Sequence, residues 1–455
     1  MNKNKEIRVR FAPSPTGLFH IGTARTALFN YLFAKKNKGK FILRIEDTDL
    51  ERSEEKYKED IISGLKWLGI EWDDKIFRQS ERTEIYQKYI KKLLDSGQAF
   101  WCEHTKEELE EEKKRQAEKK EAPRHICDRK GKKGIIRFHC EGKIKFHDLI
   151  RGDLEFDGGL LGDISIARDE KTPLFLLASA IDDATMGITH IIRGEDHIPN
   201  TPKQILLNQA LGFNIPQYAH LPLILGPDKS KLSKRHGAVS LSNYKEQGYL
   251  PEAMVNFIAL LGWNPGTEEE IFSLEELIEK FSLERVQKGG AVFDLKRLDW
   301  LNGQYIRKID LDELTQKCLP YLETNDTEYV KKIVALEQER LKKISEIGES
   351  TKFFFEEPKY DPELLIWKKM DLKEVKTNLE LLFVELSRID DFDEAKSLEK
   401  IIMPLTEKRG VGELLWPLRA ALSGQKASPG PFEIASVLGK EETLKRLEKA
   451  IKSCS

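Results

Sequence analysis

A histidine, a glycine and a threonine stand where a predicted strand gives way to a predicted helix. The segment VRFAPSPTGLFHIGT, residues 9–23, passes through a proline-stiffened loop to His20, Gly22 and Thr23. A helix N-terminus offers free N–H groups and a positive dipole end, which suit phosphate, and His20 can donate to phosphate oxygens. Gly22 lets a ligand approach the backbone closely. The segment predicts a phosphate site; the alternative is an ordinary strand–helix connection.

A second group of residues concentrates positive charge. KSKLSKRHG, residues 229–237, places Lys229, Lys231 and Lys234 in one short loop with an arginine and a histidine. Transfer of a polyphosphate needs cations where charge develops on the leaving pyrophosphate. The alternative is a solvated basic loop.

Two Cys/His pairs frame a charged stretch, Cys102 with His104 and His125 with Cys127. Two thiols and two imidazoles suit tetrahedral zinc, and four protein ligands would leave the metal a structural role. One residue within each pair is tighter than the usual spacing of about two to four. The alternative is a degenerate site of reduced side chains.

The elements that must position these residues alternate between strand and helix. Residues 7–11 and 40–47 have strand patterns. Between them, apolar residues recur at helical spacing, namely Ala24, Ala27, Leu28, Tyr31 and Leu32. Lys35 and Lys36 suit the end of that helix, and Gly39 follows as a stop. The β-α-β unit predicts a parallel sheet with ligands at the carboxyl ends of its strands.

Beyond residue 100 the pattern changes. Residues 111–122 are a charge run that fits one solvated helix face, and short strands with glycine turns follow, as in an insertion between two halves of a sheet. Residues 188–213 return to strand, loop and helix, with Thr201 and Pro202 as the expected N-cap and first helical residue. After residue 240 nearly every segment is helical in pattern.

Composition describes a globular, charge-rich chain. The 455 residues are 40% hydrophobic and 33% charged, with a net charge of −2, which neither supports nor excludes nucleic-acid binding. Five cysteines do not make a disulfide framework in a chain of this length. No apolar run reaches the length of about 18 residues that a membrane span needs. The N-terminus has no apolar signal core, so we expect a cytoplasmic location.

The order of the segments resembles the paired signatures of class I aminoacyl-tRNA synthetases, named HIGH and KMSKS, which here read HIGT and KLSKR. RFAPSPTGLFHIG, LRIEDTD, GITHIIRGEDHIPNTPKQ and KLSKRHG are similar to the bacterial glutamyl-tRNA synthetases. The resemblance continues through VFDLKRLDWLNGQYI and WPLRAALSGQKASPGPFEIASVLGKEETLKRLEKAI, so it covers essentially the whole chain.

This resemblance implies an α/β plus all-α fold. A split Rossmann-type class I catalytic domain would carry a mixed α/β insertion and be followed by helical domains. The expected divisions are a first catalytic half at 1–100, an acceptor-binding insertion at 101–188, a second half with the KLSKR loop at 189–240, a stem-contact domain at 241–325 and an anticodon-binding domain at 326–455.

The resemblance also implies a glutamate–tRNA ligase, in which ATP and L-glutamate give glutamyl-adenylate and the acyl group moves to the terminal adenosine of tRNA(Glu). Mg²⁺ would accompany ATP. By the family pattern, the catalytic residues are His20, Gly22, Thr23, Lys231 and Lys234. Of these, His20, Gly22 and Lys234 would bind ATP.

The glutamate-binding residues implied by the family pattern are Arg10, Ala12, Ser14, Glu46, Phe175, Ser179 and Arg193. The chemistry agrees, because the arginines can grip carboxylates and Glu46 can take the ammonium group. By strand pattern alone, Arg10 could instead face solvent. Glu46 could instead belong to an acid cluster with Asp47 and Asp49 at a helix N-terminus; those two we take as structural.

Phe175 and Ser179 depart from the family, which commonly has tyrosine and asparagine at these positions. Phe175 keeps the ring without the hydroxyl, and Ser179 has a shorter reach. Losing one buried hydrogen bond typically costs about 1 kcal/mol, which would weaken glutamate binding or alter selectivity. The alternative is a hydrophobic strand that contacts no ligand.

Partners follow from the resemblance. Transfer RNA would be gripped by basic residues of the C-terminal part, with Lys408, Arg409, Arg419, Lys426 and Lys440 as expected phosphate contacts. The family mostly acts as monomers. Three alternatives stay open: a non-discriminating form that also charges tRNA(Gln), a non-catalytic tRNA-binding paralogue, and a metal-dependent nucleic-acid-binding protein that would rest only on the Cys/His pairs.

Overall fold

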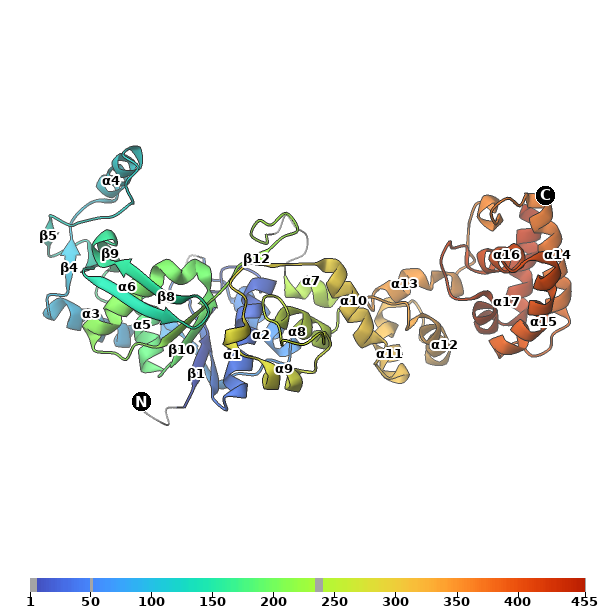
Figure 1. Ribbon diagram of the computed structural model, residues 1–455, viewed down its shortest axis with the longest axis horizontal. Helices are drawn as coiled ribbons and strands as arrows, with labels where there is room; N and C mark the ends of the chain where they lie inside the picture. The colour runs from blue at the N-terminus through green and yellow to red at the C-terminus, as the bar shows by residue number, and fades with distance from the viewer. Residues whose placement is uncertain (1–5, 50–51, 234–239, 455) are drawn as a thin grey trace. The chain divides into compact units, whose positions relative to one another are not determined.

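The computed structural model describes residues 6–49, 52–233 and 240–454. Contacts divide the chain into two compact units. The first holds 1–246 with 251–298, and the second holds 247–250 with 299–455. The first unit carries the strands, and the second is built from helices (Figure 1).

The predicted β-α-β unit opens the first unit. Strands β1 (Arg8–Phe11), β2 (Lys40–Ile45) and β3 (Asp73–Arg78) form a parallel sheet in the order β1-β2-β3. Helix α1 (Ile21–Lys36) connects the first two strands, and Lys38 and Gly39 turn the chain into β2. A Cβ on Gly39 would lie 2.3 Å from the carbonyl oxygen of Ile7, so only glycine fits there. Helices α2 (Glu55–Trp67) and α3 (Thr83–Asp95) flank β3 in sequence.

A second sheet has the order β10-β11-β7-β8. Its strands are β7 (Lys143–Asp148), β8 (Gly152–Asp157), β10 (His190–Gly194) and β11 (Gln217–Leu221). Strands β10, β11 and β7 run parallel, and β8 returns antiparallel to β7 as a hairpin. The backbone N–H of Thr189 donates to the carbonyl of Arg8 at 2.9 Å, and the N–H of Arg8 donates to the Thr189 hydroxyl. These bonds set β10 beside β1, so the two halves of a doubly wound fold meet at this point.

In the sequence, an antiparallel sheet of order β5-β4-β6-β9 is inserted between β3 and β10. Its strands are β4 (Ala99–Cys102), β5 (Lys130–Gly131), β6 (Ile135–His139) and β9 (Asp163–Ala167). Helix α4 (Lys106–Glu118) begins with a capping box from Thr105 and has no buried residue, as its charge run predicts.

Helix α5 (Phe175–Thr185) corrects one alternative from the sequence, which read residues 172–183 as a hydrophobic strand. Leu177 and Ile181, four residues apart, are fully buried against Ile136 and Ile166 of the antiparallel sheet. The other face carries buried carboxylates. In a strand, Asp183 would share a face with Leu177 and Ile181, whereas in the helix it turns away from them.

Helix α6 (Thr201–Leu211) corrects a second expectation. Its N-cap is Asn200, with no side-chain capping bond, and Thr201 is already helical. The hydroxyl of Thr201 is used elsewhere, as described below. The first unit continues with α7 (Leu241–Glu246), α8 (Pro251–Ala259), α9 (Leu274–Lys280) and the short parallel pair β12 (Ile224–Leu225) and β13 (Ala291–Val292).

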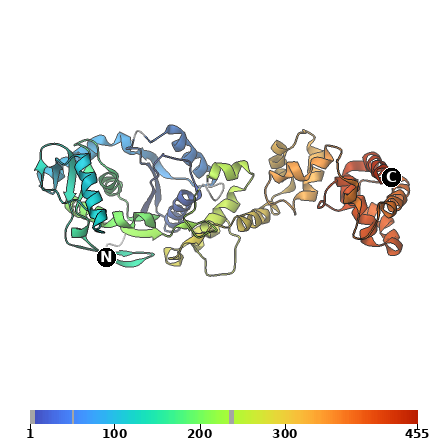
Figure 2. The ribbon, with the colours of Figure 1, turned by 90° about the horizontal axis from the view of Figure 1, so that it is seen from above.

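The second unit has no strand among residues 299–454 (Figure 2). Helix α10 (Leu295–Ile306) leads into it, followed by α11 (Leu311–Cys318), α12 (Thr327–Glu337), α13 (Glu346–Ser350), α14 (Leu372–Ser387), α15 (Ala395–Arg409), α16 (Val411–Ser423) and α17 (Pro431–Ser453), the last interrupted at Gly439. Leu379, Leu382, Leu418 and Leu447 are fully buried in its core. Each contributes about 1.5–3 kcal/mol by leaving water.

The fold class predicted from the sequence is confirmed: a parallel α/β core split by a mixed insertion and followed by helices. The finer division into five domains stays a prediction. No helix among the described residues is long and apolar enough to cross a membrane.

Candidate active site

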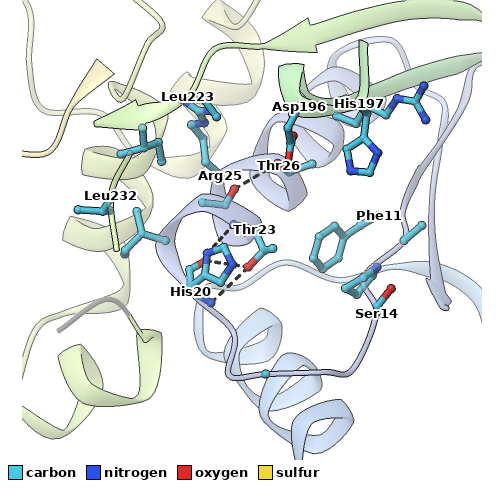
Figure 3. A pocket seen from close by; sticks show the side chains of 18 of the residues that line it. Phe11, Ser14, His20, Thr23, Arg25, Thr26, Asp196, His197, Leu223 and Leu232 are labelled. Atoms are coloured by element: carbon cyan, nitrogen blue, oxygen red, sulfur yellow. Dashed lines mark hydrogen bonds between the residues drawn. The ribbon is translucent and has the colours of Figure 1, made fainter. Parts of the chain in front are cut away.

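A cavity of about 960 Å³ opens at the carboxyl ends of β1 and β10. This is the point where the two halves of the parallel fold meet, and ligands of open α/β folds bind at such points. Figure 3 shows His20 and Thr23 on one wall, Asp196 and His197 across from them, and Phe11 and Ser14 on a further side.

His20 caps helix α1. Its Nδ1 accepts the backbone N–H of Thr23 at 3.3 Å, and the Thr23 hydroxyl accepts the N–H of His20 at 3.2 Å. Burial, and then the nearby Lys231, lowers the pKa of His20, so the ring is neutral. With Nδ1 used as an acceptor, the proton lies on Nε2, which is left to donate to a ligand.

Gly22 has a further role that the sequence did not indicate. A Cβ at this position would lie 3.2 Å from Cε1 and Nδ1 of the His20 ring. Gly22 therefore leaves room for the capping conformation of His20 as well as for a ligand.

The described part of the basic segment, residues 229–233, joins the same wall. Lys231 and Leu232 line the cavity, and the N–H of Leu232 donates to the carbonyl of Ile224. After the segment, the N–H of Leu241 donates to the carbonyl of Phe19 at 2.9 Å, directly before His20. The chain after the basic segment thus meets the residue before His20 through a backbone hydrogen bond. Lys234 lies outside the described residues.

Arg10, at the other end of the cavity, is 5% exposed, so the solvent-facing alternative is wrong. Its Nε and Nη2 donate to the two carboxylate oxygens of Asp183 at 3.0 and 3.5 Å. Glu46 follows directly after β2 and accepts from Nη2 of Arg44 at 2.8 Å. Arg44 is fully buried and also donates to Asp183 at 2.7 Å.

The pKa values of the two buried carboxylates in this network shift in opposite directions. Burial raises the pKa of Glu46, and Arg44 opposes that rise. Burial would also raise the pKa of Asp183, but Arg10 and Arg44 outweigh it and hold that pKa below its usual value. Helix α2 begins at Glu55, so Glu46 and Asp47 do not form a helix N-terminal acid cluster. Asp47 accepts from Arg78 and from Ser80, which fits the structural role expected for it.

Arg193 lies on β10 and is 6% exposed. Its Nη2 donates to the Thr201 hydroxyl at 2.8 Å and its Nε to Nε2 of His220 at 3.3 Å. Burial, and then the charge of Arg10, lowers the pKa of Arg193 to about 10. Two neighbouring buried arginines repel one another, and a bound carboxylate would relieve that repulsion.

Phe175 and Ser179 both line the cavity from helix α5. The Ser179 hydroxyl donates to the carbonyl of Phe175 at 2.8 Å and accepts from Gln204 at 2.6 Å. Its one donor and one of its two acceptor sites are therefore used within the protein. The Phe175 ring lies 5.7 Å from the ring of His197.

Sequence reasoning missed His197, Arg44 and Asp183. His197 lines the cavity, and burial, and then Arg193, lowers its pKa to about 4, so it is neutral at pH 7. The sequence did carry a signal for Arg44 and Asp183. Each is a charged residue inside an apolar strand or helix pattern, and such a residue needs a buried partner. Ala12 and Ser14, which were predicted, line the cavity from the loop after β1.

The two Cys/His pairs converge in the insertion. The Sγ of Cys102 lies 3.4 Å from Nδ1 of His104 and 3.5 Å from Nε2 of His125, and the Sγ of Cys127 lies 3.8 Å from Nδ1 of His104. All four donor atoms lie within 4.8 Å of one another. Metal–ligand bonds of about 2.0 to 2.3 Å in a tetrahedron separate the donor atoms by roughly 3.3 to 3.8 Å.

Outer carboxylates orient both imidazoles of this cluster. Nδ1 of His125 lies 2.6 Å from Glu112, and Nε2 of His104 lies 3.0 Å from Asp128. Each ring thus turns its other nitrogen toward the thiols, as a metal-binding histidine does.

The basic residues expected to contact tRNA lie in or beside α15, α16 and α17. Lys408, Arg409 and Lys426 are exposed. Arg419 stacks on the ring of Trp416 at 4.7 Å and donates to the carbonyl of Lys426, and Lys440 pairs with Asp390.

Two family models match the chain. Residues 6–300 match the catalytic domain of class I tRNA synthetases (E and Q), and residues 313–451 match an anticodon-binding domain.

Relatives match along nearly the full length. The chain is 46% identical to glutamate–tRNA ligase 2 of Thermoanaerobacter pseudethanolicus and to glutamate–tRNA ligase 1 of Caldanaerobacter subterraneus, with 98% of each chain covered. The crystal structure of a glutamate tRNA ligase from Elizabethkingia meningosepticum in complex with its amino acid is similar at a TM-score of 0.89 and 33% identity. The match covers 99% of this chain and 100% of that one.

Proposed function

The chain belongs to the class I glutamyl-tRNA synthetases, and from that premise we propose which of its residues perform each step of glutamate–tRNA ligation. One observation carries the assignment of the cavity. Two arginines and a glutamate, each at most 7% exposed, converge at one end, and a capped helix N-terminus forms the other. A dicarboxylate with an ammonium group fits the first end, and a polyphosphate fits the second.

At the ATP end, His20 donates from Nε2 to a phosphate oxygen, and the first N–H groups of α1 at Gly22 and Thr23 support the same charge. Lys231 and Lys234 neutralise the leaving pyrophosphate. Mg²⁺ bound with ATP would supply further positive charge to its phosphate oxygens.

At the glutamate end, Arg10 and Arg193 hold the carboxylates and Glu46 holds the ammonium group. Ala12 and Ser14 border the site from the loop, and Phe175 and Ser179 border it from α5. Because these charged side chains are already held in place, less entropy is lost when glutamate is oriented for the reaction.

The reaction needs no covalent enzyme intermediate. A carboxylate oxygen of glutamate attacks the α-phosphorus of ATP, the bond to pyrophosphate breaks, and glutamyl-adenylate forms. A hydroxyl of the terminal adenosine of tRNA(Glu) then attacks the acyl carbon, and AMP leaves. Positioning and electrostatic stabilisation account for the acceleration.

The helical second unit grips tRNA through phosphate contacts at Lys408, Arg409, Arg419, Lys426 and Lys440. Each phosphate contact adds to the salt dependence of binding, so we expect affinity to fall steeply with ionic strength. The enzyme acts as a monomer in this proposal.

The Cys/His cluster holds a structural zinc ion. Its support is the tetrahedral spacing of Cys102, His104, His125 and Cys127 and the two outer carboxylates. With four protein ligands, the ion would fold the insertion rather than take part in chemistry. Metal analysis should give one zinc per chain for the parent and for Cys140→Ala, a buried cysteine outside the cluster, and none for Cys102→Ser. Equal zinc in all three would exclude the site.

The assay that tests the ligase uses labelled glutamate, ATP and Mg²⁺ with purified tRNA(Glu) and tRNA(Gln) in parallel. Charging of tRNA(Glu) alone means a discriminating enzyme, and charging of both means the non-discriminating form. Charging of neither would favour the non-catalytic paralogue, for which Phe175 and Ser179 are the supporting residues.

A further inference from the structure

A chain of buried polar groups lies behind Arg193. Oδ2 of Asp148 lies 2.6 Å from Nδ1 of His220, and Nε2 of His220 lies 3.3 Å from Nε of Arg193 and 3.0 Å from the Thr201 hydroxyl. Asp148, His220 and Thr201 are fully buried. Arg193 lines the cavity, whereas the other three do not, so they can act on a ligand only through Arg193.

The strands place these groups together. Arg193 on β10 is the direct partner of His220 on β11 in the parallel ladder, and Asp148, the last residue of β7, is the partner of Tyr218 on β11. Thr201 begins α6 and turns its hydroxyl to the same point, where its oxygen accepts from Nη2 of Arg193 at 2.8 Å.

The directions of the hydrogen bonds are fixed by the carboxylate. Burial alone would raise the pKa of Asp148, but hydrogen bonds from His220 and from the N–H groups of Arg151 and Ile150 outweigh it and hold the pKa low. An ionised Asp148 only accepts, so Nδ1 of His220 carries the proton. Burial, and then the nearby Arg193, keeps the pKa of His220 low, against the opposing effect of its bond to Asp148. The neutral ring therefore turns a lone pair on Nε2 toward the Nε–H of Arg193.

We propose that Asp148 and His220 are positioning residues for glutamate binding. The carboxylate selects the tautomer of His220, and the imidazole lone pair, with the Thr201 oxygen, holds one edge of the Arg193 guanidinium. The remaining edge is left directed at the cavity. This inference rests on the proposed role of Arg193 in holding a substrate carboxylate.

The first test is Asp148→Asn, which preserves size. The asparagine oxygen can still accept the N–H groups of Ile150 and Arg151, while its NH₂ group donates to Nδ1 of His220. The ring must then take the other tautomer, and its Nε2–H opposes the N–H of Arg193. We expect the KM for glutamate in aminoacylation to rise about tenfold or more, because a hydrogen bond to a charged group is lost. The kcat and the KM for ATP should stay within about twofold.

The second test asks whether glutamate binding needs the imidazole ring of His220 itself or only a hydrogen-bond acceptor at the place of its Nε2. In His220→Gln the side-chain oxygen can occupy the place of Nε2 and accept from Arg193, whereas His220→Leu offers no acceptor. Glutamine should keep the KM for glutamate within a few-fold of the parent, and leucine should raise it about tenfold. The double variant Asp148→Asn with His220→Gln should be better than Asp148→Asn alone, because it removes the opposed N–H.

A matched control lies beside the buried pair. His147 and Asp153 form a second His–carboxylate contact, at 2.7 Å, on the exposed face of the same hairpin. Asp153→Asn should leave the KM for glutamate unchanged. The thermal unfolding midpoint of every variant shows whether a raised KM comes from loss of folding or from a displaced Arg193 side chain.

Arg193→Ala separates the two proposals. An unchanged KM for glutamate in Arg193→Ala would refute the role of Arg193 itself. A raised KM in Arg193→Ala together with a parental KM in Asp148→Asn would overturn only the positioning role. Equal losses in His220→Gln and His220→Leu would also overturn it, since the acceptor would then be irrelevant.

Discussion

The two ends of the cavity are built in different ways. At the proposed ATP end, the helix cap is local: His20 and Thr23 cap each other across three residues. At the glutamate end, Arg10 and Arg44 reach Asp183 across 173 and 139 residues, and all three are almost fully buried. The helix cap proposed to meet phosphate is thus built within a short segment, whereas the proposed amino-acid site depends on the assembled fold. Four predictions test this contrast.

The largest expected effect is on stability, in Arg44→Met. It leaves Asp183 and Glu46 short of a buried partner, and breaking a buried ion pair from one side costs about 3–5 kcal/mol. The free energy of unfolding, measured in urea by circular dichroism, should fall by that amount. Arg52→Met, which breaks an exposed pair with Asp49, should leave the urea midpoint unchanged. Equal midpoints for the two variants would contradict the idea that the glutamate end depends on buried charge.

The second effect is on rate, in His20→Asn. The asparagine oxygen can still cap the helix, but the shorter side chain has no donor at the place of Nε2. Adenylate formation, followed by ATP–pyrophosphate exchange in the presence of tRNA, should slow about 10²- to 10³-fold, as when one preorganised donor is removed. The free energy of unfolding should stay near the parental value in His20→Asn, while His20→Ala should lower it by ~1 kcal/mol through the lost cap. A parental exchange rate in His20→Asn would remove His20 from the chemistry.

The third effect is a pH dependence at the glutamate end. In the unfolded chain a histidine takes up a proton near its ordinary pKa of about 6.5, whereas His197 in the fold does so only near 4. The unfolded state therefore binds more protons between these values, and stability falls as the pH drops from about 6.5 to about 4, by at most about 3 kcal/mol. Replacing His197 by asparagine should flatten the urea midpoint over this interval. An equally steep profile in the variant would assign the loss to other groups.

The smallest effect is expected from Phe175→Tyr with Ser179→Asn, which restores the residues common in the family. One added hydrogen bond is worth about 1 kcal/mol, so the KM for glutamate should fall about fivefold. Steady-state charging of tRNA(Glu) measures this. A rise in KM would mean that Gln204 and His197 have adapted to the smaller pair.

What the sequence predicted follows the same contrast. The strand, loop and capped helix around His20 and Gly22 could be predicted, because helix starts depend on neighbouring residues. Thr201 was misjudged as an N-cap, since its tertiary bond to Arg193 was invisible locally. Arg10 and Glu46 were found through the family resemblance, but Arg44 and Asp183 were not, because nothing in local periodicity says which distant charges meet. The same holds for Asp148 and His220.

The β7–β8 hairpin has a consequence for association between chains. Strand β8 is the outer strand of its sheet, and its exposed side chains at alternate positions are Asp153, Glu155 and Asp157. A second copy pairing along this edge would bring carboxylates against carboxylates, and such like-charge contacts oppose the edge-to-edge growth that leads to aggregation. The hairpin thus protects a concentrated solution of the enzyme from sheet extension at that edge.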